Sequence, residues 1–436
     1  MTDKISKITA RQVLDSRGNP TIYAIVKTSD ENYGFSCVPS GASTGSKEAL
    51  EMRDNDPKKF NGKGVLKAIE NINNEIFPTI LGMEINDINS IDLRMIELDG
   101  TEFKSSLGAN AILAVSMACT RAAASSSKIE LFEFIRELYD SKKTEYKLPN
   151  PMFNVLNGGS HAFNSTDFQE YMIVPTGISN FEDSISAGFQ IYNKLKNILE
   201  SKNLPTTLGD EGGFAPPGLS NEEPLKLLSN AVSETGLSLG QDIKFALDVA
   251  ASEFYNESTG NYELKSENKN VSSIELTGIY KNLVDNYPIY SIEDGLSEDD
   301  WEGWRKLTDS IGNNIQLVGD DLFVTQKKFL TKGIDENAGN SILIKLNQVG
   351  TVTETIENIK VAQNNNFETI ISHRSGETED TFIADLAVGT DSTQIKTGAP
   401  ARGERVNKYN RLLLISDLVK EKFNLEAKNN LVGKYK

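Results

Sequence analysis

The sequence predicts an α/β barrel preceded by a smaller α+β domain, and three observations support this fold class. The chain has 436 residues, which is too long for one ordinary domain and fits a barrel with an added domain. In the C-terminal part, short apolar runs that end in charged residues recur about every 25 residues, and a βα unit takes roughly 30. The N-terminal part instead combines alternating strands with a long helical segment.

The first 35 residues are predicted to form an antiparallel hairpin. Apolar and polar residues alternate over 5–13 and 21–27, and the turn sequence SRGNP at 16–20 separates the two runs. Residues 38–45, VPSGASTG, are small and rich in hydroxyl groups, which predicts a mobile loop. This loop is not a phosphate-binding P-loop, because Ser46 stands where that motif requires lysine.

Helices separated by glycines are predicted between residues 47 and 140. The most apolar of them, 110–124, contains Asn, Ser, Thr and Arg and is too short to span a bilayer, so we predict a buried helix. The polar stretch 141–150 ends near a proline and has the composition of a linker. We therefore divide the chain into an α+β domain of residues 1–140, which carries the mobile loop, and an α/β barrel domain of residues 141–436.

Six apolar runs of the second domain are predicted to be barrel strands: 244–249, 289–294, 315–321, 341–347, 369–375 and 394–398. Each run has ionisable residues where it ends. The strand C-termini of such a barrel form one face, and that face carries the active site. A single charge of this kind is best explained as a helix cap or an exposed loop residue, but a series of six is not. A helix at 412–422 is predicted to close the fold.

The run 341–347, SILIKLN, is central to this prediction because a lysine is almost never fully buried unless it is paired or used. The alternative is that Lys345 ends the strand and extends to water. The two histidines are predicted to be site residues, because His161 lies in a glycine-rich loop and His373 at a strand end. The sequence TTLGDEGGFAPP at 206–217 indicates a backbone packed close to a ligand at a strand end, or a simple tight turn.

These residue types together predict a reaction class. Three carboxylates at neighbouring strand ends suit a hard cation such as Mg²⁺, which takes oxygen ligands: Asp248, Glu293 and Asp320. Arg374, Ser375 and Lys396 suit a phosphate or carboxylate group. Lys345 remains as a candidate base, and nearby cations would lower its pKa. A glutamate remains as a candidate acid, and neighbouring carboxylates would raise its pKa. This combination predicts proton abstraction next to a carboxylate.

Composition excludes several classes of protein. The net charge of −17 argues against nucleic-acid binding, because contacts to phosphates need a basic surface. It is compatible with a divalent-cation site and equally with a generally acidic surface. Cys37 and Cys119 are far apart and lack metal-site spacing, which predicts a reducing cytosol. The N-terminus lacks the apolar core of a signal peptide, so we expect a cytoplasmic location.

A series of short motifs runs in order along nearly the whole chain: DSRGNP at 15–20, PSGASTG at 39–45, NGGSHA at 157–162, QE at 169–170, GDEGGFAP at 209–216, ALDVAASEFY at 246–255, SIEDG at 291–295, GDDLFVT at 319–325, KLNQVG at 345–350, SHRSGETED at 372–380 and QIKTGAP at 394–400. Each motif is moderately specific, and the combination is highly specific. The sequence resembles the enolase family (phosphopyruvate hydratase) and is most similar to its bacterial branch.

The resemblance implies the reversible, Mg²⁺-dependent dehydration of 2-phosphoglycerate to phosphoenolpyruvate in glycolysis. Lys345 resembles the base that removes the C2 proton, and Glu211 resembles the acid that helps the C3 hydroxyl leave. The ligands implied for two Mg²⁺ ions are Asp248, Glu293 and Asp320 for the first and Ser40 for the second. The implied substrate-binding residues are His161, Gln169, Glu170, His373, Arg374, Ser375 and Lys396.

The resemblance also implies an eight-stranded barrel whose first units depart from simple βα order, and a homo-oligomer that is either a dimer or an octamer of dimers. Two alternatives remain. One is a binding role, either at a cell surface, where Lys436 would contribute to plasminogen binding, or in an RNA-degradation assembly. Direct nucleic-acid binding is not expected in either case. The other is a related acid dehydratase or racemase. Ser160 and Phe163 depart from the family pattern beside His161, which puts loop closure in doubt.

Overall fold

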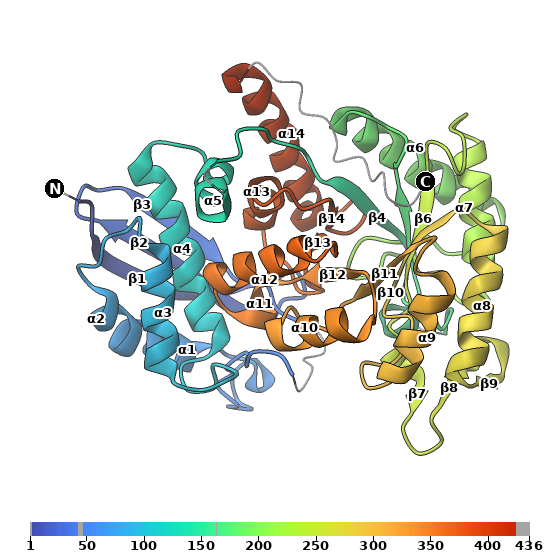
Figure 1. The fold of residues 1–436 in the computed structure, drawn as a ribbon, viewed down its shortest axis with the longest axis horizontal. Coiled ribbons are helices and arrows are strands. Elements are labelled where there is room, and N and C mark those ends of the chain that lie inside the picture. The colour runs from blue at the N-terminus through green and yellow to red at the C-terminus, as the bar shows by residue number, and fades with distance from the viewer. Residues whose placement is uncertain (1, 42–46, 141, 163, 424–436) are drawn as a thin grey trace.

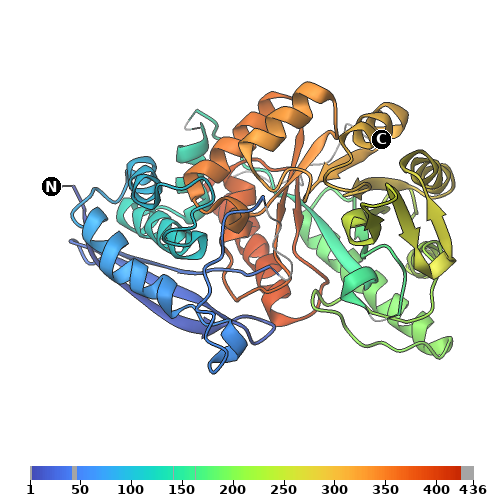
Figure 2. The same cartoon turned by 90° about the horizontal axis from the view of Figure 1, so that it is seen from below.

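A computed structural model gives the fold of the protein and describes residues 2–41, 47–140, 142–162 and 164–423. An antiparallel sheet with its helices forms one side of the molecule, and a closed barrel wrapped by helices forms the other (Figures 1 and 2). The predicted fold class, an eight-stranded α/β barrel preceded by a small α+β domain, is confirmed.

The N-terminal sheet contains the predicted hairpin of β1 (Ile5–Leu14) and β2 (Pro20–Thr28), which pair antiparallel. A third strand, β3 (Tyr33–Cys37), pairs with β2 and was missed by the sequence prediction. Its pattern is reversed, since Gly34 and Ser36 face inward while the alternating aromatic residues Tyr33 and Phe35 are exposed. Small inward residues let the sheet approach a helix closely, so hydrophobic alternation alone does not reveal this strand.

Helices cover this sheet: α1 (Leu66–Asn71), α2 (Phe77–Ile80), α3 (Ile88–Asp99), α4 (Ala109–Ser127) and α5 (Leu131–Asp140). A π-helical turn, Ile72–Ile76, joins α1 to α2. The helix α4 lies along β3 and is buried over most of its length, which confirms the buried helix predicted at 110–124. Its alanines and serines permit this close packing on both sides.

Eight strands close the barrel: β4 (Asn150–Asn157), β5 (Glu170–Val174), β6 (Lys244–Asp248), β10 (Ile289–Glu293), β11 (Gln316–Gly319), β12 (Ser341–Ile344), β13 (Glu368–Ser372) and β14 (Gln394–Lys396). All neighbouring pairs are parallel except those of β5, which runs antiparallel to β4 and β6. The departure from βα order implied for the first units is therefore confirmed. Because β5 is reversed, its first residue, Glu170, pairs with Asp248 at the last position of β6.

The outer layer of the barrel consists of α6 (Phe181–Ser201), α7 (Glu223–Ser233), α8 (Ser273–Asn286), α9 (Trp301–Ile311), α10 (Lys327–Glu336), α11 (Leu346–Val349), α12 (Val352–Asn364), α13 (Phe382–Gly389) and α14 (Gly403–Phe423). A small antiparallel sheet of β7 (Tyr255–Asn256), β8 (Asn261–Leu264) and β9 (Lys269–Val271) projects beside them (Figure 1). Inside the barrel, a separate apolar cluster packs below the strand ends: Met152, Met172, Val174, Ala246, Val318, Leu343 and Ile370.

The six predicted strand runs are all strands, but three sequence predictions need correction. The run 341–347 ends as a strand at Ile344, and α11 begins directly after Lys345. The helix predicted at 412–422 begins earlier, at Gly403, because polar residues of its first turns face inward and hide the helical period. Residues 206–217 do not follow a regular strand and form a turn that closes with a Gly209–Gly213 backbone hydrogen bond of 2.9 Å.

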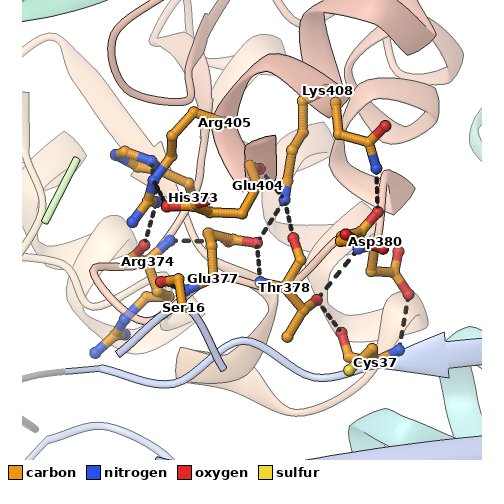
Figure 3. A network of polar contacts seen from close by, with 12 residues as sticks. Ser16, Cys37, His373, Arg374, Glu377, Thr378, Asp380, Glu404, Arg405 and Lys408 are labelled. Carbon is orange, nitrogen blue, oxygen red and sulfur yellow. Dashed lines mark hydrogen bonds and ion pairs between the residues drawn. The ribbon is translucent and has the colours of Figure 1, made fainter. Parts of the chain in front are cut away.

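Polar contacts join the two parts of the molecule. On β3, the backbone N–H of Cys37 donates to Asp380 at 2.8 Å, and Arg121 of α4 forms an ion pair with the same carboxylate at 2.6 Å. Figure 3 shows the hydrogen bond between Cys37 and Asp380. Beside it lies a buried ion pair in which the Lys408 ammonium is 2.8 Å from Glu377. The loop after β13 therefore fixes the sheet against the barrel.

None of the helices in the described ranges combines the length and the apolar composition that a bilayer-spanning segment needs.

We predict that Gly34→Ala destabilises the N-terminal domain. A Cβ at this position would lie 2.2 Å from the carbonyl oxygen of Ala118 and 2.3 Å from the backbone nitrogen of Ala122. The helix must then move away from the sheet, and overpacking of this kind costs about 1–3 kcal/mol. The matched control is Gly278→Ala on exposed α8, where nothing lies within 4 Å of the added carbon. Thermal unfolding should show a Tm below that of the wild type for Gly34→Ala and a Tm equal to or above it for Gly278→Ala. A wild-type Tm in Gly34→Ala would contradict the packing argument.

Candidate active site

A pocket of about 660 Å³ opens where the barrel strands end. Its walls are predominantly charged and polar. Ten of the residues singled out from the sequence line it: Gln169, Glu170, Glu211, Asp248, Asp320, Lys345, His373, Arg374, Ser375 and Lys396. The barrel topology brings these residues together from strands that are distant in the chain, as the series of charged strand ends predicts.

Two predicted residues lie outside the pocket wall. Glu293 is buried beneath it and meets the pocket through Lys396. The Ser40 hydroxyl donates to Asp15 at 2.5 Å, and the Ser40 backbone exchanges hydrogen bonds with Gly376 at 2.8 and 2.9 Å. Ser40 is thus anchored to the loop after β13, and its hydroxyl oxygen keeps lone pairs for a cation while it donates to Asp15.

Some predicted features fall outside what the structure describes. These are residues 42–45 of the predicted mobile loop, the side chain of His161, and the positions Phe163 and Lys436.

The ammonium group of Lys396 lies at the centre of three buried carboxylates. Its Nζ is 2.8 Å from Asp248, 2.8 Å from Glu293 and 3.1 Å from Glu170. Burial by itself would lower the pKa of Lys396, but these charges hold it well above its usual value. Burial and neighbouring carboxylates raise the pKa of Glu170 and of Glu293 well above the ordinary range. The predicted anion-binding lysine is therefore, in this structure, the counter-ion of the carboxylates.

Lys345 projects from the end of β12 and forms an ion pair with Asp320. Burial by itself would lower the pKa of this lysine, but the charge of Asp320 raises it overall. Arg374 and Lys396 lower the pKa of Lys345, as expected of nearby cations, but the charge of Asp320 outweighs them. Burial raises and Lys345 lowers the pKa of Asp320, and the net shift is downward.

Glu211 is held by neighbours from two other segments. The Asn154 side chain of β4 donates to its Oε2 at 2.8 Å, and Nε2 of His373 lies 3.6 Å from its Oε1. The glycine at 213 is needed because a Cβ there would lie 2.4 Å from the side-chain oxygen of Asn157. The turn packs closely on a protein side chain at Gly213, and its residues Gly209, Asp210 and Glu211 line the pocket.

Arg374 points into the pocket with its guanidinium held by two residues. Nη1 donates to Glu48 at 3.1 Å and to Asn347 at 3.3 Å. Burial by itself would lower the pKa of Arg374, but the charge of Glu48 raises it overall. Glu48 belongs to the N-terminal domain, so that domain contributes to the wall. Sequence reasoning missed it because no local pattern marks a residue that reaches its partner across the chain.

Two further acidic residues were also missed as site residues, although the sequence carried a signal for them. The motifs SIEDG and GDDLFVT each contain two adjacent acids, and the second acids are Asp294 and Asp321. Oxygens of Asp294, Asp320 and Asp321 lie within 4.8 Å of one another. Backbone N–H groups of 320 and 321 donate to Asp294 at 2.9 and 2.8 Å. Burial and the charge of Asp320 raise the pKa of Asp321 to about 7, so negative charge is in excess here.

This excess charge fits a hard divalent cation. Asp248, Glu293 and Asp320 end or follow three consecutive strands of the barrel order, β6, β10 and β11. They offer only oxygen donors, as Mg²⁺ prefers. In this structure the ammonium groups of Lys396 and Lys345 offset the charge of these carboxylates. Among the described residues, the acids whose oxygens lie close enough together to share an ion are Asp294, Asp320 and Asp321, so only Asp320 belongs to both sets.

Comparison with protein families gives two matches that together cover most of the chain. Residues 5–135 match the family described as "Enolase, N-terminal domain". Residues 145–432 match the family described as "Enolase, C-terminal TIM barrel domain".

We predict that Mg²⁺ raises the Tm of the protein through the carboxylates at the strand ends. A ligand that binds only the folded state stabilises it by about 2.7 kcal/mol at a concentration of 100 Kd. Asp320→Asn should remove most of this shift, measured by thermal unfolding with Mg²⁺ and with chelator. The control is Glu302→Gln on exposed α9, which should keep the full shift. A shift of the same size in the Asp320 variant and the wild type would place the cation elsewhere.

Proposed function

The chain belongs to the enolase family, and we propose that it catalyses the reversible dehydration of 2-phosphoglycerate to phosphoenolpyruvate. Membership of the family implies a lyase. The specific reaction, its place in glycolysis, a cytoplasmic location and the bacterial branch are parts of the proposal. They are supported by the order and spacing of the sequence motifs.

The observation that carries the proposal is that a lysine and a glutamate line one pocket from separate parts of the barrel. Lys345 follows β12, whereas Glu211 is held by Asn154 of β4, which is not a neighbour of β12 in the barrel. An elimination needs a base at one carbon and an acid at the leaving group of the next carbon. Two groups that approach from different sides suit this requirement.

Lys345 can accept a proton only when its amine is neutral. Its ion pair with Asp320 keeps it protonated, so proton abstraction requires this ion pair to open. The carboxyl group of Glu170 neighbours Glu211, and burial together with the charge of Glu211 raises the pKa of Glu170 well above its usual value. A raised pKa beside Glu211 favours the sharing of a proton between these two acids, which suits the acid side of the pocket.

In this proposal the anion-binding part of the pocket consists of Arg374 and Ser375, which line it. Lys396 joins them when a metal ion takes the place of its ammonium among the carboxylates. Arg374 suits a phosphate because its planar guanidinium offers paired donors, and Glu48 holds its orientation. In this proposal these side chains position the substrate and do not take part in bond breaking.

The carboxylates of Asp248, Glu293 and Asp320 would hold Mg²⁺, and Ser40 is proposed as a ligand of a second ion. When bound, such ions supply positive charge that offsets the negative charge developing on the substrate carboxylate as the C2 proton leaves. The oxygen-only donor set and the buried excess of carboxylates support this assignment.

The first test follows ultraviolet absorbance as 2-phosphoglycerate becomes a conjugated enol phosphate. We expect a rise in the wild type with Mg²⁺, none with chelator, and a rate about 10²- to 10⁴-fold lower in Lys345→Ala. The control Lys360→Ala removes a lysine of α12 that donates to the carbonyl of Leu138, and it should keep the wild-type rate. No rise in the Mg²⁺-loaded wild type would contradict the proposal and favour a related acid dehydratase or racemase.

A second prediction separates the base from the acid. In deuterated water, Glu211→Gln should still exchange the C2 hydrogen of 2-phosphoglycerate, because Lys345 is intact, while phosphoenolpyruvate formation falls about 10²- to 10⁴-fold. Lys345→Ala should lose both. Mass spectrometry of the recovered substrate measures the exchange. If Glu211→Gln keeps the wild-type thermal stability but loses the exchange, Glu211 itself takes part in removing the C2 proton. That result would contradict the separate roles proposed for Lys345 and Glu211.

A further inference from the structure

Arg405, in the first turn of α14, is fully buried and directs its guanidinium at two loops of the active site. Figure 3 shows it beside His373 and Arg374 of the loop after β13. Nη1 lies 2.7 Å from Nδ1 of His373 and donates to the carbonyl oxygen of Arg374 at 2.7 Å. Nη2 donates to the carbonyl oxygens of Asp210 at 3.0 Å and Ser375 at 2.8 Å. One side chain thus connects the loop that carries Glu211 to the loop that carries Arg374.

The contact with His373 determines which ring nitrogen carries the proton. A guanidinium has five N–H donors and no acceptor, and it stays charged in proteins. Nδ1 of His373 must therefore accept, so the hydrogen of the neutral ring is on Nε2. Burial, together with the charges of Arg405 and two site lysines, lowers the pKa of His373 well below its ordinary value, so the ring is neutral.

The Nε2 atom faces the reacting part of the pocket. It is buried, makes no hydrogen bond to the described residues, and lies 3.6 Å from Oε1 of Glu211. His373 also lines the pocket. A buried N–H that lacks a partner is unfavourable, which indicates that an acceptor occupies this place in the working enzyme.

We propose that Arg405 is a positioning residue that holds His373 in the tautomer with its proton on Nε2, so that the pocket presents a fixed N–H donor beside Glu211. The other tautomer would turn a lone pair toward Glu211 and toward any substrate oxygen there, which would repel both. Arg405 acts through His373 and through the loop carbonyls, and it does not touch the pocket contents itself. The kinetic part of this inference rests on the proposed dehydration, whereas the tautomer itself does not.

The tautomer can be measured directly because the chain contains only two histidines. Nitrogen-15 shifts of histidine-labelled full-length protein distinguish protonated from unprotonated ring nitrogens, and the signal absent in His373→Gln assigns His373. We expect an unprotonated Nδ1 and a protonated Nε2 in the wild type. A protonated Nδ1 in the wild type would overturn the proposal without any need for a variant.

Two substitutions test the cause. Arg405→Met should convert at least part of the His373 signal to the Nδ1-protonated form, and Arg405→Lys, which keeps a charged donor, should convert less. The matched control is Arg411→Met on the same helix, which breaks ion pairs with Asp385 and Glu130 away from the pocket and should leave the His373 signal unchanged. If Arg405→Met does not fold, Arg405→Lys and the wild type still decide the outcome. A folded Arg405→Met with the wild-type tautomer would refute the inference.

The kinetic expectation is a kcat about 10- to 100-fold lower in Arg405→Met, the size of loss typical when an orienting partner of a site residue is removed. The variant Arg405→Lys should recover part of it, and Arg411→Met should stay near the wild type. If the wild type does not convert 2-phosphoglycerate, the proposed reaction fails while the nitrogen-15 result stands. A wild-type kcat in a folded Arg405→Met whose tautomer has changed would show that the tautomer does not serve this reaction.

Discussion

The ion cluster around Lys396 is the interaction on which the rest of the site depends. Its ammonium lies within about 3 Å of three carboxylates that come from three other strands. Burying one carboxylate without a partner costs several kcal/mol, so these acids can lie together inside the barrel only around positive charge. The same requirement makes the cluster suitable for a metal ion, because any cation of suitable size relieves the same repulsion.

The position of the cluster follows from two features of the barrel. An apolar layer fills the interior below the strand ends, so the charged side chains lie on a packed floor and are displayed at one face. The reversed strand β5 brings Glu170 to this face from the start of a strand rather than from its end. Without the reversal, Glu170 would lie at the opposite end of the barrel from Asp248.

The N-terminal domain completes the wall of the pocket. Glu48 orients Arg374, and the loop after β13 is held in turn by β3 and by Arg121. On the other side of that loop, α14 supplies Arg405, whose guanidinium donates to the backbone carbonyl oxygens of Arg374 and Ser375. The loop after β13 is therefore held by the N-terminal domain on one side and by α14 on the other. Such support suits a segment whose side chains are proposed to bind an anion.

The amino-acid pattern alone predicts the barrel and most of the residues on its reactive face. Short apolar runs ending in Asp248, Lys345 or His373 are local patterns, and a closed barrel places all such ends together whatever the details of packing. The family resemblance supplied Glu211 and Glu170, which lie on segments that the βα pattern did not mark.

The partners of these residues become visible only in the folded protein. It paired Lys345 with Asp320, placed Lys396 among carboxylates, turned Ser40 toward Asp15 and brought Glu48 and Arg405 to the site. These pairings join residues that are far apart in the chain, and the pKa of each group follows from its partner and its burial rather than from its neighbours in sequence. Periodicity shows which residues face the site, but the charge state of a buried group is set by contacts that form only when the chain has folded.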